Sequence, residues 1–179
     1  MTKRTRMTIL FAIAGIIFIA AAMSAILFWD GAARAVPHDS LLARYLPVFR
    51  GCNPPLPRES LSIGSTTWSV EVASTAVEQA CGLSGRSGLG DQEGMLFPFS
   101  KPSVQNFWMK DMNFPIDMIW ISGDTVVGSV ERASPQPGVP LWKLTIYSSP
   151  DGTDKVLEVN SGTIAKYGIR VGDRIEIGK

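Results

Sequence analysis

From about residue 62 onward, the chain consists of short apolar runs separated by turn residues. In residues 68–73, WSVEVA, apolar and polar positions alternate with the period of two that is typical of a half-buried strand. Similar runs predict further strands at residues 94–99, 104–109, 116–121, 125–130, 143–147, 155–159 and 173–177. Gly, Pro, Asn, Asp and Ser gather between these runs, as expected of turns. The pattern therefore predicts about eight short strands.

Two short helices are expected among these strands. The first, at residues 75–82, begins with a capping box formed by Thr75 and Glu78 and ends at Gly82. The second, at residues 161–168, is capped by Ser161 and ends at Gly168. Many short strands with two small helices predict a mainly β domain, either a sandwich or a barrel-like fold, spanning residues 62–179.

The N-terminal part of the chain has a different pattern. Residues 7–29 contain no Asp, Glu, Lys or Arg, and a helix of that length, at about 1.5 Å per residue, can cross a ~30 Å hydrocarbon core. The basic tail at residues 1–6, with Lys3, Arg4 and Arg6, is expected to stay in the cytoplasm. The sequence thus predicts a single-pass membrane protein whose C-terminal domain is extracytoplasmic, in the periplasm or on the cell surface.

A cleaved signal peptide is the alternative for this segment. Ala33 and Ala35 flank Arg34 in an A-x-A cleavage site, and cleavage after Ala35 would give a secreted protein. The apolar run exceeds the roughly 7 to 15 residues that are usual in signal peptides, so we favour an uncleaved anchor. Residues 30–61 carry five prolines and are expected to form a linker between this anchor and the β domain.

The composition excludes several kinds of chemistry. From Val36 onward, thirteen Lys and Arg face fifteen Asp and Glu with no basic cluster, so nucleic acid is not expected as a partner. The only histidine, His38, lies in the linker, which argues against a metal site, and no cofactor is predicted. Cys52 and Cys81 are expected to form a disulfide outside the cytoplasm; a reactive thiol pair is the alternative, although the C-x-x-C spacing is absent.

Candidate site residues gather in residues 106–120, NFWMKDMNFPIDMIW. If residues 116–121 form a strand, Asp117 shares a face with two isoleucines and must be either exposed at the strand end or paired. Arg86 and Lys110 are candidate partners. One interpretation is that Asp117 accepts hydrogen bonds from the backbone amides of residues 110–113, and the other is that it orients a ligand.

Two further features could contribute to such a site. Trp108 faces away from Phe107 and Met109, so one of the two faces exposes large apolar side chains unless both are covered. Glu158 is a second acid within an apolar strand, and it faces the same way as Val156. Asp117 and Glu158 could divide acid and base roles if they faced one cavity, whereas two unrelated salt bridges are the alternative.

Several ordered motifs resemble one known family. The runs VEVASTAVEQACGLSGR, GMLFPF, FWMKDMNFPIDMIWI, VLEVNSG and GIRVGDRI are similar to the domain of unknown function 192 family, a prokaryotic group of small, mostly β proteins that are often exported or lipid-anchored. The resemblance implies a β-sandwich-like fold but no established reaction. Ser84 departs from the family pattern, since many members have methionine there, and many carry an arginine near the position of Gln79.

Taken together, these features predict a membrane-anchored, extracytoplasmic β domain that binds a small polar ligand, such as a sugar or another envelope component. The predicted ligand-binding residues are Arg86, Phe107, Trp108, Lys110, Asp117 and Glu158. A protein-interaction module of an envelope complex and a hydrolase that uses Asp117 and Glu158 are the alternatives.

Overall fold

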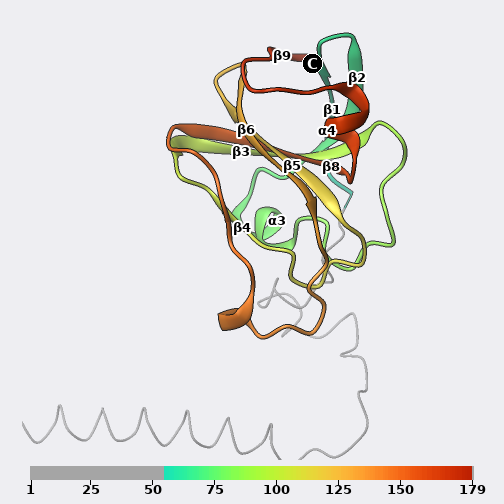
Figure 1. The fold of residues 1–179 in the computed structure, drawn as a ribbon, viewed down its shortest axis with the longest axis vertical. Helices are drawn as coiled ribbons and strands as arrows, with labels where there is room; N and C mark the ends of the chain where they lie inside the picture. The colour runs from blue at the N-terminus through green and yellow to red at the C-terminus, as the bar shows by residue number, and fades with distance from the viewer. Residues whose placement is uncertain (1–54, 179) are drawn as a thin grey trace, which may run out of the picture. The chain divides into compact units, whose positions relative to one another are not determined.

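Residues 55–178 are described by the computed structural model, and all structural statements below refer to them. They form a mainly β domain, as the sequence predicts (Figure 1). Its elements are β1 (Arg58–Ile63), β2 (Thr66–Val72), α3 (Ala76–Cys81), β3 (Glu93–Ser103), β4 (Asn106–Phe107), β5 (Ile116–Ser122), β6 (Thr125–Ala133), the 3-10 turn η2 (Leu141–Lys143), β7 (Tyr147–Ser148), β8 (Thr153–Asn160), α4 (Thr163–Tyr167) and β9 (Ile175–Gly178).

Seven of these strands form one curled sheet in the order β6-β5-β8-β3-β2-β1-β9. Neighbouring strands are antiparallel except β2 and β3. The curl brings the edge strand β6 back toward the other edge, where Thr125 pairs with Arg174 just before β9 and the Val126 amide donates to the Asp173 carbonyl at 2.9 Å. The sheet is therefore a half-barrel, and β4 and β7 form a separate two-stranded ribbon.

The sheet buries both of its faces. The first hydrophobic cluster draws side chains from both ends of the sheet and from α4, so it fills the inside of the curl. The second cluster lies on the opposite face. Figure 1 shows α3 and β4 on one side of β3, β5 and β8, and α4 with β1 and β9 on the other. Residues 116–121 of β5 are buried on both faces, with Ile116, Met118 and Trp120 in the second cluster and Ile119 and Ile121 in the first.

The predicted capping box is confirmed. The Glu78 amide donates to the Thr75 hydroxyl, and the Thr75 amide donates to the Glu78 carboxylate at 2.7 Å. Gly82 then ends α3 at a φ of 48°, a backbone conformation that favours glycine. The cap predicted for the second helix is wrong. The N-cap residue of α4 is Gly162 and not Ser161, and glycine has no side chain that could bond the first turn.

Three predicted boundaries also differ from the structure. β1 begins at Arg58, inside the segment predicted as linker. The sequence pattern does not reveal this strand, because Leu61 and Ile63 are its only apolar residues. The strand predicted at residues 143–147 is wrong, since a 3-10 turn precedes the two-residue strand β7. The strand predicted at residues 104–109 shrinks to Asn106–Phe107.

Several predictions concern residues outside the described range. They are the basic tail at residues 1–6, the apolar segment at residues 7–29, most of the linker, and Cys52 as partner of Cys81. These remain predictions from the sequence. Between residues 55 and 178, no helix is long and apolar enough to cross a membrane.

Candidate functional site

A pocket of about 270 Å³ opens on the face of the sheet that carries the second cluster. One wall is α3 with the turn at residues 82–84, and the other is residues 105–108 at β4. Two hydrogen bonds join the turn that follows α3 to the segment that follows β4. The Ser84 hydroxyl donates to the Lys110 carbonyl at 3.0 Å, and the Gly85 amide donates to the Asp111 carbonyl at 2.9 Å. The pocket is therefore built by segments far apart in the sequence.

Aromatic rings make up much of the lining. Phe107 points inward from β4 and meets Phe97 and Trp120 at centroid distances of 5.1 and 5.6 Å in edge-to-face geometry. Trp108, next in the chain, lies at the pocket with 43% of its surface exposed. The other apolar lining residues are Ala76, Ala80, Leu83, Phe99 and Met112.

Glu158 is the acidic side chain of this pocket. On β8 it lies between Met95 of β3 and Met118 of β5, both fully buried. The residue is 5% exposed, and no hydrogen bond or neighbouring charge within residues 55–178 offsets its desolvation. Burial raises the pKa of the Glu158 carboxyl from 4.5 to about 8, so the group is neutral at pH 7.

Gly94 allows the backbone to approach Glu158 closely. A Cβ at this position would lie 2.8 Å from the carbonyl oxygen of Glu158, which is closer than real Cβ atoms come to backbone oxygen. Because only glycine lacks that atom, Gly94 fixes the spacing of β3 and β8 at the point where Glu158 enters the pocket.

The amide nitrogens of Gln79 and Gln105, two of the three amide side chains that line the pocket, are engaged within the protein. The Gln79 amide nitrogen donates to the carbonyl oxygen of Pro98 at 2.8 Å, and the Gln105 amide nitrogen donates to the Ser103 hydroxyl at 3.0 Å. Glu158 therefore differs from these neighbours, because its carboxyl has hydrogen-bonding capacity that the protein leaves unused.

Asp117 lies on the opposite face of the sheet. It pairs with Val159 in the ladder, whereas Met118 pairs with Glu158, so the two acids project in opposite directions. The side chain of Asp117 is fully buried, and its oxygens accept the backbone N–H of Arg132 at 2.8 Å and of Ile164 at 2.9 Å. Asp117 and Glu158 therefore do not share the cleft that the hydrolase alternative requires.

Both amides bonded by Asp117 lack a regular partner in secondary structure. Arg132 has a φ of 55° and lies in an irregular stretch of β6, where the register with β5 shifts. Ile164 is in the first turn of α4, where an N–H has no acceptor inside the helix. Asp117 thus ties a bulge and a helix to the same strand, and the amides predicted from residues 110–113 are not its partners.

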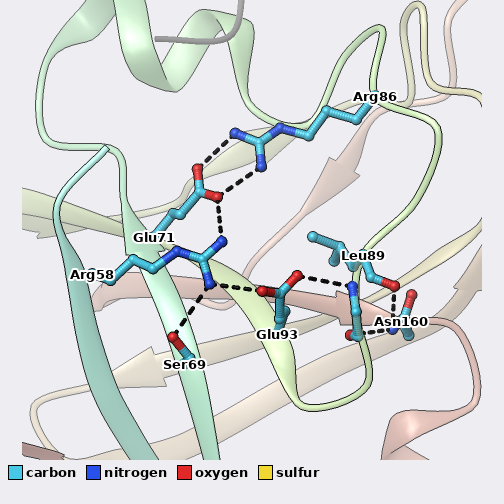
Figure 2. Close-up of polar contacts among 8 residues, drawn as sticks. Arg58, Ser69, Glu71, Arg86, Leu89, Glu93 and Asn160 are labelled. Carbon is cyan, nitrogen blue, oxygen red and sulfur yellow. Dashed lines mark hydrogen bonds and ion pairs between the residues drawn. The ribbon is translucent and has the colours of Figure 1, made fainter. Parts of the chain in front are cut away.

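Arg86 bonds a different acid from the one predicted. Its guanidinium makes a bidentate contact with Glu71 of β2, at 3.0 and 2.7 Å, and Arg58 reaches the same carboxylate at 3.0 Å (Figure 2). The hydrogen bond from Arg86 lowers the pKa of Glu71. Arg58 also bonds Glu93 at 2.7 Å, which lowers the pKa of that carboxyl.

The same network holds the glycine-rich loop at residues 82–94. The Gly90 amide donates to Glu93 at 2.9 Å, and Asn160 donates to the carbonyl oxygens of Leu89 and Gly90 (Figure 2). Together with the Arg86 contact, these bonds fix the loop against β2 and β8. Arg86 therefore acts on the fold here, away from the pocket.

Lys110 also lies apart from the pocket lining. It forms an exposed ion pair with Asp111 rather than with Asp117. Of the six residues predicted to bind a ligand, the structure thus brings together Phe107, Trp108 and Glu158. The sequence did not reveal that α3 and Phe97 line the pocket, because no sequence pattern indicates that this helix packs near the Phe97 ring on β3.

The comparisons with known proteins agree with the fold. The chain matches the sequence model of the domain of unknown function 192 (DUF192) family, described as an uncharacterized ACR, over residues 59–177. No curated protein matches the chain. The match covers most of the described domain, so the chain belongs to this family, in agreement with the motif resemblance.

Two solved structures are similar. One is a protein of unknown function from Novosphingobium aromaticivorans, with 33% identity, a TM-score of 0.61, and coverage of 68% of this chain and 86% of that chain. The other is a Sinorhizobium meliloti protein suggested to be a transcription regulator, with 27% identity, a TM-score of 0.64, and coverage of 70% of this chain and 97% of that chain. The Sinorhizobium meliloti chain is therefore little longer than the matched domain.

Proposed function

We propose that the domain binds a small, largely apolar ligand carrying one hydroxyl or carbonyl group, in the pocket between α3 and β4. The observation that carries this proposal is the carboxyl of Glu158, which has no hydrogen-bond partner among the described residues and lines an aromatic pocket. An acidic group that lines an aromatic pocket with a raised pKa and unused hydrogen-bonding capacity is typical of a ligand site.

The size and walls of the pocket support a small molecule. Its volume of about 270 Å³ is just below the roughly 300 to 1,000 Å³ that is typical of ligand sites, which suits a small molecule. Rings from Phe97, Phe99, Phe107 and Trp108 offer flat apolar contact on several sides. A ligand with a compact apolar body would fill this space.

The polar groups narrow the chemical class. A neutral carboxyl donates one hydrogen bond and accepts one, which suits a single hydroxyl or carbonyl of the ligand. The amide nitrogens of Gln79 and Gln105 are engaged internally, so they are not available to donate to the hydroxyls of a sugar. In place of the polar ligand predicted from the sequence, we therefore propose an amphiphilic molecule with one polar group.

A binding experiment on the Val48–Lys179 unit tests this proposal, because this part of the chain forms a compact unit and a related chain of little more than the domain folds. Neutral compounds with one hydroxyl or carbonyl would be screened beside sugars by thermal shift. A ligand at about 100 times its dissociation constant should stabilise the fold by roughly 2.7 kcal/mol. We expect the first group to shift the melting temperature and the sugars to leave it unchanged.

Two variants of Glu158 give the test its control. Glu158→Leu should weaken binding at least about tenfold because the ligand loses its hydrogen bond, whereas Glu158→Gln keeps a donor and should retain binding. In the wild type, affinity should fall as the pH rises through about 8, where the carboxyl ionises, and Glu158→Gln should remove this dependence. Binding unchanged in Glu158→Leu, or no binding by any compound, would refute the proposal.

The cellular location is a separate proposal based on the sequence alone. Residues 7–29 are long and apolar enough for an anchor, and the preceding basic residues favour an extracytoplasmic domain. Protease added to intact spheroplasts should then digest the domain while leaving cytoplasmic proteins uncut. Protection of the domain under these conditions would rule out this orientation.

A further inference from the structure

Large apolar side chains are exposed on the segment between β6 and β7. Leu141 is 65% exposed and Trp142 is 84% exposed, and Ile146 a few residues later is half exposed. Lys143 lies among them at the surface, and residues 134–148 contain no Asp or Glu. An exposed tryptophan beside an exposed leucine leaves a large apolar area in water, which a soluble surface rarely does without a binding role.

The segment holds these side chains on an ordered scaffold. The Lys143 amide donates to the Pro140 carbonyl at 2.9 Å, which closes the 3-10 turn η2. The Gln136 side chain bridges the base of the loop, because it accepts the Thr145 amide at 3.0 Å and donates to the Thr145 hydroxyl at 3.1 Å. The apolar tip is therefore presented by a closed loop.

A second exposed tryptophan extends this surface. β4 and β7 pair Asn106 with Ser148 and Phe107 with Tyr147, so the same register, continued by one residue, sets Trp108 opposite Ile146. Both of these side chains are partly exposed. We define the tip patch as Trp108, Leu141, Trp142, Lys143 and Ile146.

The position of the loop is consistent with a surface that faces the membrane. In Figure 1 the orange turn with η2 lies at the end of the domain that holds α3, away from α4 and the turn between β1 and β2. Leu56, near the start of the described chain, packs against the second cluster, on the face of the sheet that also carries α3.

The chain outside the described residues supplies an apolar segment within reach. Residues 30–54 separate that segment from the domain, and at about 3.3 to 3.6 Å per residue they span up to roughly 80 to 90 Å. A linker of this length allows the domain to rest its tip on the bilayer in which residues 7–29 are predicted to lie.

We propose that the tip patch docks on the surface of a lipid bilayer. Tryptophan and leucine insert favourably at the boundary between headgroups and acyl chains, and tryptophan is enriched there because its ring is amphipathic. Lys143, with no acidic neighbour in the loop, adds attraction to anionic headgroups. The patch shares Trp108 with the pocket, so the test changes only Leu141 and Trp142, which are not among the residues that line the pocket.

Vesicle sedimentation of the Val48–Lys179 unit tests the proposal, because this unit lacks residues 7–29 and any binding must come from the domain. The vesicles would contain phosphatidylethanolamine, with or without phosphatidylglycerol. We expect the wild type to bind, and the double change Leu141→Ser with Trp142→Ser to lower the partition coefficient at least about tenfold. Lys143→Gln should lower binding by about fivefold, and only on vesicles with phosphatidylglycerol.

Val171→Ser is the matched control. Val171 is 69% exposed, like Leu141, but it precedes β9 at the other side of the sheet. This variant should bind vesicles like the wild type. Absence of wild-type binding, or equal binding by the Leu141 and Trp142 variant, would overturn the proposal.

Self-association is the competing outcome. Light scattering would show a dimer that the double variant converts to a monomer, without vesicle binding by either, and this result would assign the tip patch to a contact between copies of the chain and overturn the proposal. Ligand titration of the double variant separates the two proposals, because pocket binding should survive the loss of Leu141 and Trp142.

Discussion

Asp117 and Glu158 are two buried acids on neighbouring strands of one sheet, yet they are held in opposite ways. Asp117 points into the curl and accepts two backbone amides, whereas Glu158 points to the other face and has no donor from residues 55–178. Burial is nearly the same for both. The difference therefore lies in the partners that the fold supplies.

This difference separates a structural acid from a candidate functional one. The fold offers Asp117 two amides that have no other acceptor, so the residue and the amides satisfy each other. For Glu158 the fold provides methionine neighbours and a pocket. An acid that remains desolvated at a cost to stability, beside an opening lined by aromatic rings, is better explained by binding than by folding.

The largest expected effect concerns the pH dependence that Glu158 gives to stability. The folded-state pKa of about 8 is raised above the unfolded value of 4.5, so the contribution of Glu158 to the free energy of unfolding is highest below pH 4.5 and falls as the pH rises to about 8. A displacement of that size corresponds to on the order of 5 kcal/mol. Urea unfolding of the Val48–Lys179 unit at a series of pH values measures this loss.

Glu158→Gln is the control for that measurement. The variant keeps the shape of the side chain and cannot ionise, so its free energy of unfolding should vary much less between pH 4.5 and 8. If wild type and Glu158→Gln show the same slope over this range, the carboxyl is not desolvated in solution, and the contrast with Asp117 disappears.

The second-largest effect on the free energy of unfolding is expected when the Asp117 carboxylate, on the other face of the sheet, is removed. Asp117→Ala leaves the buried amides of Arg132 and Ile164 without partners, and at about 1 to 3 kcal/mol for each group the free energy of unfolding should fall by about 3 to 4 kcal/mol. Asp117→Asn keeps one acceptor and should lose about half as much. Chemical denaturation measures both variants.

The effects of losing the Asp117 carboxylate should be confined to its own face of the sheet. In Asp117→Ala, amide hydrogen exchange should speed up at Arg132 and at Ile164, because these N–H groups lose their acceptor. Ligand binding in the pocket should persist in the folded fraction. Loss of binding with unchanged stability would reverse the roles assigned to Asp117 and Glu158.

Much of the fold could be predicted because it depends on local patterns. Alternation identified β2, apolar runs between turn residues identified β5 and β8, and the capping box identified α3. The missed features depend on tertiary contacts. α4 begins at Thr163, after Gly162, where Asp117, distant in the sequence, bonds its first turn, and no local cap encodes that contact.

The site was predictable only in part, for a similar reason. Phe107 and Trp108 stand out as adjacent large rings, and Glu158 as an acid in an apolar strand. Whether two acids lie on the same face depends on which strands pair and in what register. β5 and β8 are neighbours, and their register places Asp117 and Glu158 on opposite faces. Arg86 could not be assigned to Glu71, because that pairing depends on the glycine-rich loop folding back onto β2.

Glu71 extends the comparison to a nearly buried acid with charged partners, and it gives the smallest expected change in the free energy of unfolding. Arg86→Met should lower this free energy by about 1 to 2 kcal/mol, since Arg58 still bonds Glu71. Lys110→Met removes an exposed ion pair and should change it by less than about 0.5 kcal/mol. The pKa of Glu71 is lowered, so its stabilisation is lost below pH 4.5, in the opposite direction to Glu158. Equal effects of the two variants in urea unfolding would show that the bidentate contact adds nothing beyond a surface ion pair.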